Sequence, residues 1–242
     1  MWEAMWWGLV GGLALVVGAI VGLVGNPRPK VIALVMAFGS GVLISALAFE
    51  LAAEAFSGGG ALALAAGLAA GSAAFFLGDL VIDRRGGEHR KRSDGRQRSG
   101  APLAIVLGSL LDGIPESAAI GVSLLDGGAV GTAVVAAVFL SNVPESMAAA
   151  SGLRKAGHSA RWILGLWAGV AAVSALAAGL GFATLGGASP ETVAVVQAFA
   201  AGAILTMLAD TMMPEAFENG GSATGVVATF GFTTAFLVSH LA

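Results

Sequence analysis

Eight stretches of apolar residues follow one another along this chain, and each is long enough to cross a lipid bilayer as a helix. A crossing needs about 20 apolar residues, and a segment in lipid must satisfy its own backbone hydrogen bonds, as a helix does. We therefore predict an all-α, polytopic membrane protein with one transmembrane domain over residues 1–242. The expected spans are residues 5–24, 31–53, 60–82, 101–124, 129–152, 162–185, 191–213 and 222–241.

The composition agrees with a protein embedded in a membrane. Hydrophobic residues make up 57% of the chain and charged residues 11%, whereas about 25% of the residues in a soluble domain are charged. The 37 glycines suit transmembrane helices that pack closely. The absence of cysteine excludes disulfides, thiolate metal ligands and thiol nucleophiles.

The basic residues predict the orientation of the spans. All 12 lysines and arginines lie in three alternate connections, at residues 28–30, 84–98 and 154–161. By the positive-inside rule, these connections are cytoplasmic. We therefore expect a multi-pass protein of the bacterial inner (plasma) membrane with both termini outside.

The connection at residues 83–100 is the longest polar run in the chain. Because it has no apolar periodicity, we expect a cytoplasmic loop without packed structure, whose charges set the topology. Binding of anionic lipid or nucleic acid by this loop is the alternative interpretation. We expect no nucleic-acid partner.

Two pairs of similar segments predict an internal repeat. Residues 37–60 and 198–221 align without a gap and share Ala-Phe, Leu-Ala, Glu-Ala-Phe and a closing Gly-Gly. In the expected topology these two segments run in opposite directions, and so do the hexapeptides at residues 112–117 and 141–146. We predict an inverted repeat in a 3+2+3 arrangement of helices, which in secondary transporters places the substrate site near the midplane.

The two hexapeptides, Asp-Gly-Ile-Pro-Glu-Ser and Ser-Asn-Val-Pro-Glu-Ser, carry the candidate site. Ionisable side chains inside a membrane are costly and by default mark a functional site. Asp112 and Glu116 are four residues apart and therefore share one face of a helix, as do Ser141 and Glu145. The proline in each hexapeptide lacks an N–H and so leaves a backbone carbonyl oxygen without its usual partner.

The expected site is a cage of oxygen atoms for a divalent cation, because hard cations prefer oxygen ligands. The predicted metal ligands are Asp112, Glu116, Ser141, Asn142 and Glu145, with Ser117 and Ser146 beside them on the transport pathway. Two other interpretations of the glutamates stay open. In the first, each glutamate is a protonated residue at a proline kink. In the second, the two glutamates together carry protons and no metal.

These features resemble the ZIP family of divalent metal transporters, of the bacterial type. The likeness rests on the eight spans, the long third connection, the paired hexapeptides and the segments at residues 50–55 and 210–216. It implies that Glu116 and Glu145 bridge a binuclear metal centre and that the protein is a homodimer. The outer ligands it implies are Asp112, Ser141 and Asn142, and the further pathway residues are Glu50, Glu54, Asp210 and Glu215.

The chain departs from the ZIP pattern at the metal site. Asp112, Gly113, Ser117 and Ser141 stand where the family has His, Asn, Gly and His. Imidazole is a ligand that zinc prefers, and its loss in favour of oxygen donors favours manganese, iron(II), magnesium or broad selectivity. Zinc and cadmium are not distinguished from these metals by the residues present.

We therefore predict a secondary transporter that moves divalent metal cations by alternating access, with the metal as substrate, the bilayer as partner and no cofactor. An enzyme is not predicted, because the spans offer neither a nucleophile with its base nor a pair of metal-binding histidines. One alternative is a proton-coupled carrier of small solutes, although the spans contain no Lys or Arg to hold an anion. The other alternative is a transport-inactive metal-binding membrane protein.

Overall fold

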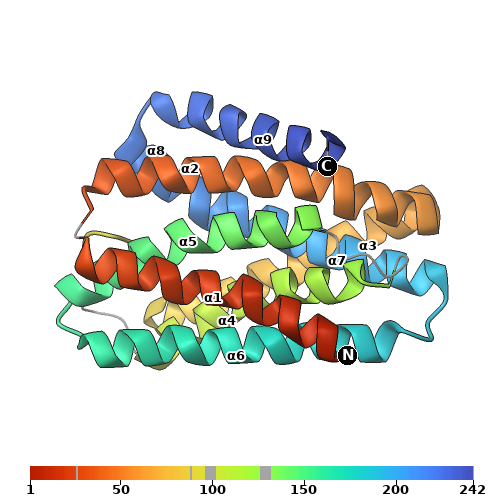
Figure 1. The fold of residues 1–242 in the computed structure, drawn as a ribbon, viewed down its shortest axis with the longest axis horizontal. Coiled ribbons are helices and arrows are strands. Elements are labelled where there is room, and N and C mark those ends of the chain that lie inside the picture. Colours follow the sequence, from red (N-terminus) through yellow and green to blue (C-terminus); the bar gives the residue numbers. More distant parts are fainter. Residues whose placement is uncertain (26, 88, 96–101, 126–131, 242) are drawn as a thin grey trace.

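Long helices that lie roughly along one axis make up the structure (Figure 1). It is a computed structural model that describes residues 1–25, 27–87, 89–95, 102–125 and 132–241. Its elements are α1 (Trp2–Val24), α2 (Pro29–Ala46), η1 (Leu47–Ala52), α3 (Ala53–Ile82), η2 (Asp83–Gly87), α4 (Pro102–Ser123), α5 (Thr132–Lys155), α6 (Ala160–Leu185), α7 (Pro190–Met207), η4 (Leu208–Met212), α8 (Met213–Gly220) and α9 (Ala223–Leu241). None of the described residues belongs to a β-strand, and the all-α prediction is confirmed.

Seven helical stretches are long and apolar enough to cross a membrane, as a multi-pass membrane protein requires. One of them, Pro29–Gly87, has 59 residues and, if straight, would be about three times as long as the hydrocarbon core is thick. It is interrupted at Gly60, where φ is 73° and ψ is −176°. The expected spans at residues 31–53 and 60–82 lie on the two sides of this break, and the chain turns back between them (Figure 1).

Two helices begin where the sequence supplies a serine cap. The Ser159 hydroxyl accepts a hydrogen bond from the backbone N–H of Trp162 at the start of α6. The Ser189 hydroxyl accepts one from the N–H of Thr192 at the start of α7. Pro190 follows as the first residue of α7, a position where the missing N–H of proline costs no helical hydrogen bond.

Glycines let the backbones of neighbouring helices touch. A Cβ atom at Gly41 in α2 would collide with the carbonyl oxygen of Ala228 in α9, and one at Gly202 in α7 would collide with that of Leu68 in α3. The reciprocal contacts are Gly231 against Phe38 and Gly71 against Phe199. Close approach through small residues is a main source of helix association in membranes.

The two aligned segments contain the same departures from regular helix. A π-helical segment begins at Leu47 in the first segment and at Leu208 in the second, and these two residues occupy the same place in the alignment. The last residues of the alignment, Gly60 and Gly221, both have positive φ, of 73° and 63°. Such φ values favour glycine, which has no Cβ to clash with the backbone.

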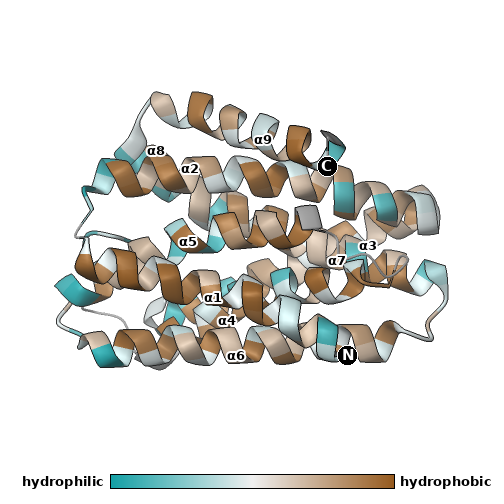
Figure 2. Ribbon diagram, in the orientation of Figure 1, coloured by the Kyte–Doolittle hydropathy of each residue, from teal (hydrophilic) through white to brown (hydrophobic). Residues whose placement is uncertain are grey.

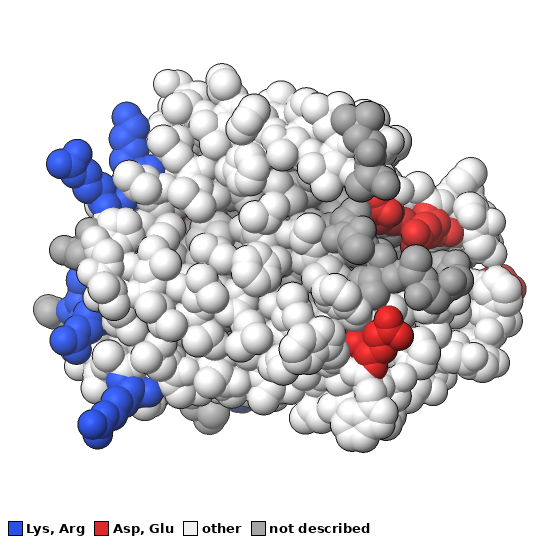
Figure 3. All heavy atoms as spheres, in the orientation of Figure 1, with Lys and Arg blue, Asp and Glu red and all other residues white. Residues whose placement is uncertain are grey.

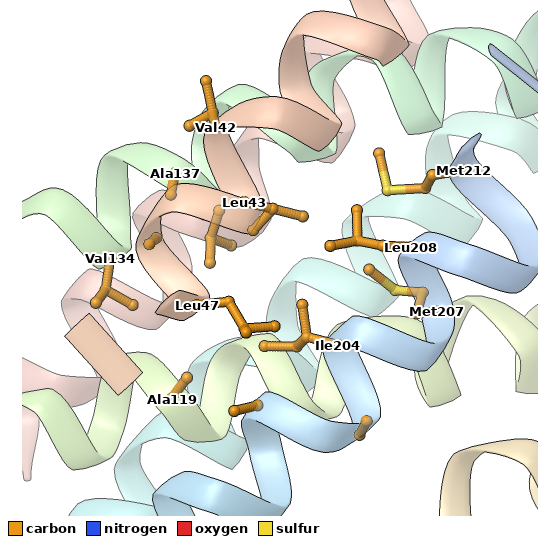
Figure 4. Close-up of a cluster of buried hydrophobic side chains, with 14 of the residues drawn as sticks. Val42, Leu43, Leu47, Ala119, Val134, Ala137, Ile204, Met207, Leu208 and Met212 are labelled. Carbon is orange, nitrogen blue, oxygen red and sulfur yellow. The ribbon is translucent and has the colours of Figure 1, made fainter. Parts of the chain in front are cut away.

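A buried apolar cluster joins the two aligned segments (Figure 4). Leu43 and Leu47 of the first segment pack with Ile204, Leu208 and Met212 of the second. All five of these side chains belong to the hydrophobic core.

The polarity of the residues changes along the long axis of the bundle. Apolar residues cover the middle of the helices and polar residues collect toward their ends (Figure 2). Basic side chains gather at one end of the bundle (Figure 3). The exposed basic residues include Arg28, Lys30, Arg154, Lys155 and Arg161. The N- and C-termini both lie toward the opposite end, on the lower and upper sides of the bundle in this view (Figure 1).

The prediction of an unpacked loop at residues 83–100 is wrong for its first part. Arg90, Lys91 and Ser93 are only 4%, 6% and 1% exposed. The physical reason is that buried carboxylates of the helices attract these basic residues, whereas hydropathy alone places every charged loop in water. Residues 96–100 lie outside the described part of the chain.

Candidate functional site

Glu116 on α4 and Glu145 on α5 are buried in the interior of the bundle, 1% and 3% exposed. Glu145 lies about 15 Å along α5 from the end of that helix at Lys155, at 1.5 Å of rise per residue. Asp112 lies about the same distance from the start of α4 at Pro102. These depths correspond to the middle of a hydrocarbon core about 30 Å thick.

Neighbouring helices hold the α5 hexapeptide by direct backbone contact. A Cβ atom at Gly18 of α1 would collide with the carbonyl oxygen of Val143. A Cβ atom at Gly39 of α2 would lie 3.1 Å from the carbonyl oxygen of Leu140 and 3.3 Å from Cγ of Pro144. Both α4 and α5 continue as helices through their prolines. Each glutamate therefore follows its proline on the same continuous helix.

The serine hydroxyls of the hexapeptides donate to their own helices. Ser117 donates to the carbonyl oxygen of Gly113 at 2.6 Å, and Ser146 donates to that of Asn142 at 2.7 Å. Ser141 donates to the carbonyl oxygen of Val138 at 3.0 Å. These bonds use the hydroxyl protons and leave oxygen lone pairs as the groups that a cation could contact.

Asn142 connects the two hexapeptides and α1. Its Nδ2 donates to the carbonyl oxygen of Gly11 in α1 at 3.1 Å, and its side chain also makes a hydrogen bond with Glu116. One carboxylate oxygen of Glu116, Oε1, is buried with no hydrogen-bond partner in the described part of the chain. A buried oxygen of this kind is costly unless a cation or proton satisfies it.

Lys91 brings a positive charge between the two hexapeptides. Its Nζ lies 3.3 Å from Oδ2 of Asp112 and 3.3 Å from Oε2 of Glu145. Lys91 thus interacts with one carboxylate from each of the two hexapeptides. In addition, its charge interacts with that of Glu116.

Arg90 binds three carboxylates next to Lys91. Its Nε and Nη2 form a two-pronged contact with Asp112, each at 3.1 Å, the arrangement that gives arginine–carboxylate pairs their strength. Nη2 also lies 2.5 Å from Asp79, and Nη1 lies 3.4 Å from Asp83. Burial opposes the charged form of Arg90, but the attraction and hydrogen bonds of Asp112, followed by those of Asp79, outweigh it and raise the pKa of the guanidinium.

The next two residues attach the loop to α8 and α5. Arg92 Nη1 lies 3.0 Å from Oε2 of Glu215 and also pairs with Glu218. The backbone N–H and the hydroxyl of Ser93 donate to Oε1 of Glu215 at 3.3 and 3.4 Å. Lys155 Nζ donates to the carbonyl oxygen of Ser93 at 2.8 Å. We call residues 90–93 the basic segment.

Two predicted pathway residues lie beside the basic segment. Asp210 and Glu215 line a cavity of about 70 Å³ together with Asp79, Asp83 and all three basic side chains. Glu215 is buried and Asp210 is exposed. The basic segment is therefore close to the residues expected to line the route on this side.

The other two pathway residues line separate cavities. Glu50 accepts a hydrogen bond from Ser239 at 2.6 Å and lines a cavity of about 50 Å³ between α2, α5 and α9. Glu54 accepts one from Gln197 at 2.9 Å and lines a wider cavity of about 440 Å³. The structure does not place Glu50 or Glu54 among the residues that line the cavity beside the basic segment.

Among the described residues, no group of three or more His, Asp or Glu side chains has a geometry that could hold a metal ion. Asp112, Glu116, Asn142 and Glu145 share one buried polar region, which also holds the ammonium of Lys91 and the guanidinium of Arg90. Their role as metal ligands stays a prediction.

Sequence patterns did not predict the burial of the basic segment. Arg90, Lys91 and Arg92 stand in a run of polar residues, which hydropathy assigns to water. One signal could have found them: buried carboxylates need opposite charge nearby, and the spans contain no basic residue that could supply it. A search of the sequence against models of protein families and against curated proteins finds no match.

Proposed function

We propose that this protein is a secondary transporter of divalent metal cations, with Glu116 and Glu145 at the centre of its substrate site. The observation that carries the proposal is that these two carboxylates, on adjacent helices, are buried at mid-depth of the bundle around a positive charge. Such a site stabilises a cation that has lost its water, because the oxygen atoms replace the hydration shell. The metal is the cargo and passes from one side to the other by alternating access.

We propose eight membrane crossings. If Pro29–Gly87 crosses twice, with its turn at Gly60, the number of crossings is even. An even number agrees with the position of both termini at the same end of the bundle (Figure 1). The exposed basic residues at the other end (Figure 3) support a cytoplasmic assignment for that end, with both termini outside.

We also propose that the two halves of the chain are inverted repeats. The π-helical segments at Leu47 and Leu208 and the positive φ values at Gly60 and Gly221 support this relationship. The packing of α3 on α7 and of α2 on α9 supports it too, because each pair contains equivalent glycine contacts. In such transporters each half can adopt the conformation of the other, and this exchange opens the substrate site to one side of the membrane and then to the other.

Membership of the ZIP family is part of the proposal and rests on the resemblance of the motifs. The oxygen donors of Asp112, Glu116 and Glu145, with the amide of Asn142, favour manganese, iron(II) or magnesium over softer metals. Zinc and cadmium remain substrates to be tested beside them.

The basic segment favours a second candidate function, a metal-binding protein that does not transport. In that case Arg90 and Lys91 hold the carboxylates permanently, and the site never opens. A carrier of organic anions is less well supported, because the charges of Arg90 and Lys91 already face Asp79, Asp112 and Glu145.

Uptake of Mn²⁺ into proteoliposomes tests the proposal. Glu116→Gln and Glu145→Gln should each reduce uptake to the level of empty liposomes, because each removes a charged ligand. Glu191→Gln, at an exposed residue, is the matched control and should transport normally. Normal uptake by both site variants would refute the metal site, and binding without uptake by the unsubstituted protein would favour the non-transporting candidate.

A further inference from the structure

We propose that the basic segment, residues 90–93, is a built-in inhibitor that occupies the substrate site and that a divalent cation must displace it. This inference rests on the proposed function and adds a mode of regulation to it. Its starting point is that the Lys91 ammonium lies 3.3 Å from Asp112 and 3.3 Å from Glu145. A divalent cation bound by these oxygens would repel the ammonium at this short distance and take its place.

The position of the ammonium depends on a chain of contacts along the whole segment. Arg90 is fixed by the two-pronged contact with Asp112. Arg92 and Ser93 are fixed on Glu215. Lys91 lies between these two anchors, so its side chain is directed into the bundle instead of into solvent.

The helix surface provides room for this arrangement. A Cβ atom at Gly108 of α4 would collide with Cδ of Arg90. The side chain of Arg90 therefore passes directly over a helix position that has no side chain. An accidental contact of a charged loop with the surface would not need such a gap.

The basic segment also connects elements that would have to separate during transport. Its ion pairs reach α3, η2, α4, α5 and α8; the carboxylates are those of Asp79, Asp83, Asp112, Glu145, Glu215 and Glu218. An opening of the bundle from the basic end requires these pairs to break. The segment thus keeps that end closed while it fills the site.

Displacement is energetically feasible because buried ion pairs contribute little net stability. Removal of two charges from water costs nearly as much as their attraction returns. A divalent cation brings twice the charge of an ammonium to the same carboxylates, while the released basic side chains regain their hydration. The two occupants therefore compete for one set of oxygen atoms.

Calorimetric titration of the purified protein with Mn²⁺ tests this competition. Lys91→Met removes the ammonium and keeps most of the side-chain length, and the matched control Lys30→Met removes an exposed lysine. We expect Lys91→Met to bind Mn²⁺ at least about tenfold more tightly than the unsubstituted protein, and Lys30→Met to bind unchanged. Equal or weaker binding by Lys91→Met would overturn the inhibitory role.

The same titration separates this inference from the proposed function. If Glu116→Gln, placed in the Lys91→Met protein, still binds Mn²⁺ with full affinity, the metal site itself is wrong. If Glu116→Gln abolishes binding but Lys91→Met leaves the affinity unchanged, the metal site stands and only the inhibitory role fails.

A labelling experiment tests displacement even if Lys91→Met does not fold. The chain has no cysteine, so Ser93→Cys introduces a single thiol at a position that is 1% exposed. We expect slow reaction with a maleimide and faster reaction when Mn²⁺ is added, because Mn²⁺ releases the segment. Arg84→Cys, at an exposed position, should react fast with and without Mn²⁺. A Ser93→Cys rate that Mn²⁺ does not change would overturn the displacement.

Discussion

Nζ of Lys91 lies 3.3 Å from Oε2 of Glu145, although the two residues belong to a polar loop and to the middle of a membrane-type helix. Both side chains are almost fully buried. A buried lysine and a buried glutamate each need the other, because an unpaired charge in this position is very unfavourable. The contact ties the charge balance of the proposed substrate site to the loop.

The ion-pair network predicts a large loss of stability when its central acid is removed. Asp112→Asn leaves both Arg90 and Lys91 without their shared carboxylate, and we expect it to destabilise the protein by about 3–5 kcal/mol. Thermal unfolding in detergent micelles measures the effect. In the double variant Asp112→Asn, Arg90→Gln the loss should be smaller than the sum of the single losses, since the two residues interact directly. Strict additivity would contradict the contact.

The glycine contacts between helices predict position-specific sensitivity to alanine. Gly202→Ala should destabilise the protein by about 1–3 kcal/mol, because its new Cβ would collide with the backbone of Leu68. Gly165→Ala is the matched control, since no atom lies near the Cβ it would add. The control should be neutral or slightly stabilising, as alanine is the better helix former. Similar melting temperatures for the two variants would argue against close packing of α3 and α7.

The position of Gly108 under Arg90 predicts a mild way to loosen the basic segment. Gly108→Ala should push the Arg90 side chain away from α4 and so weaken its contact with Asp112. In a Ser93→Cys background, we expect the thiol to react several-fold faster with a maleimide than in the parent. Gly169→Ala in the same background, at a position with free space, should leave the rate unchanged. An unchanged rate in Gly108→Ala would show that Arg90 does not hold the segment.

The turn at Gly60 predicts which residues face each side of the membrane. With eight crossings, single cysteines at Ser57 and Gly187 should react with a membrane-impermeant maleimide added outside intact cells. Cysteines at Arg84 and Ser222 should react only after the cells are opened. All four positions are suitable because Ser57, Gly187, Arg84 and Ser222 are exposed in the structure. Protection of Ser57→Cys from the outside reagent would mean that the stretch Pro29–Gly87 does not turn at the outer face.

The two aligned segments of the sequence share local departures from regular helix in the structure. The alignment of residues 37–60 with 198–221 uses only residue identity, and the structure places a π-helical segment and a positive-φ glycine at matching positions of the two segments. The burial of Asp112, Glu116 and Glu145 was predictable, since each stands in an apolar stretch. Their surroundings were not. Lys91, from a polar loop, lies beside Asp112 and Glu145, and the ligand cage expected from the spacing of the hexapeptides stays a prediction.

The sequence alone determined three features of this protein. They are the helical membrane-type architecture, the approximate limits of the long helices and the burial of the acidic hexapeptides. Hydropathy and helix periodicity act over neighbouring residues, and a single chain displays them without reference to its fold. Only the tertiary structure decided where the positive charge opposite those acids comes from. The pairing of Ser93 with Glu215 joins residues 122 positions apart, and that of Arg90 with Asp112 joins residues 22 apart. No local pattern specifies such pairs, because they form only when folded helices bring their carboxylates within reach of the loop.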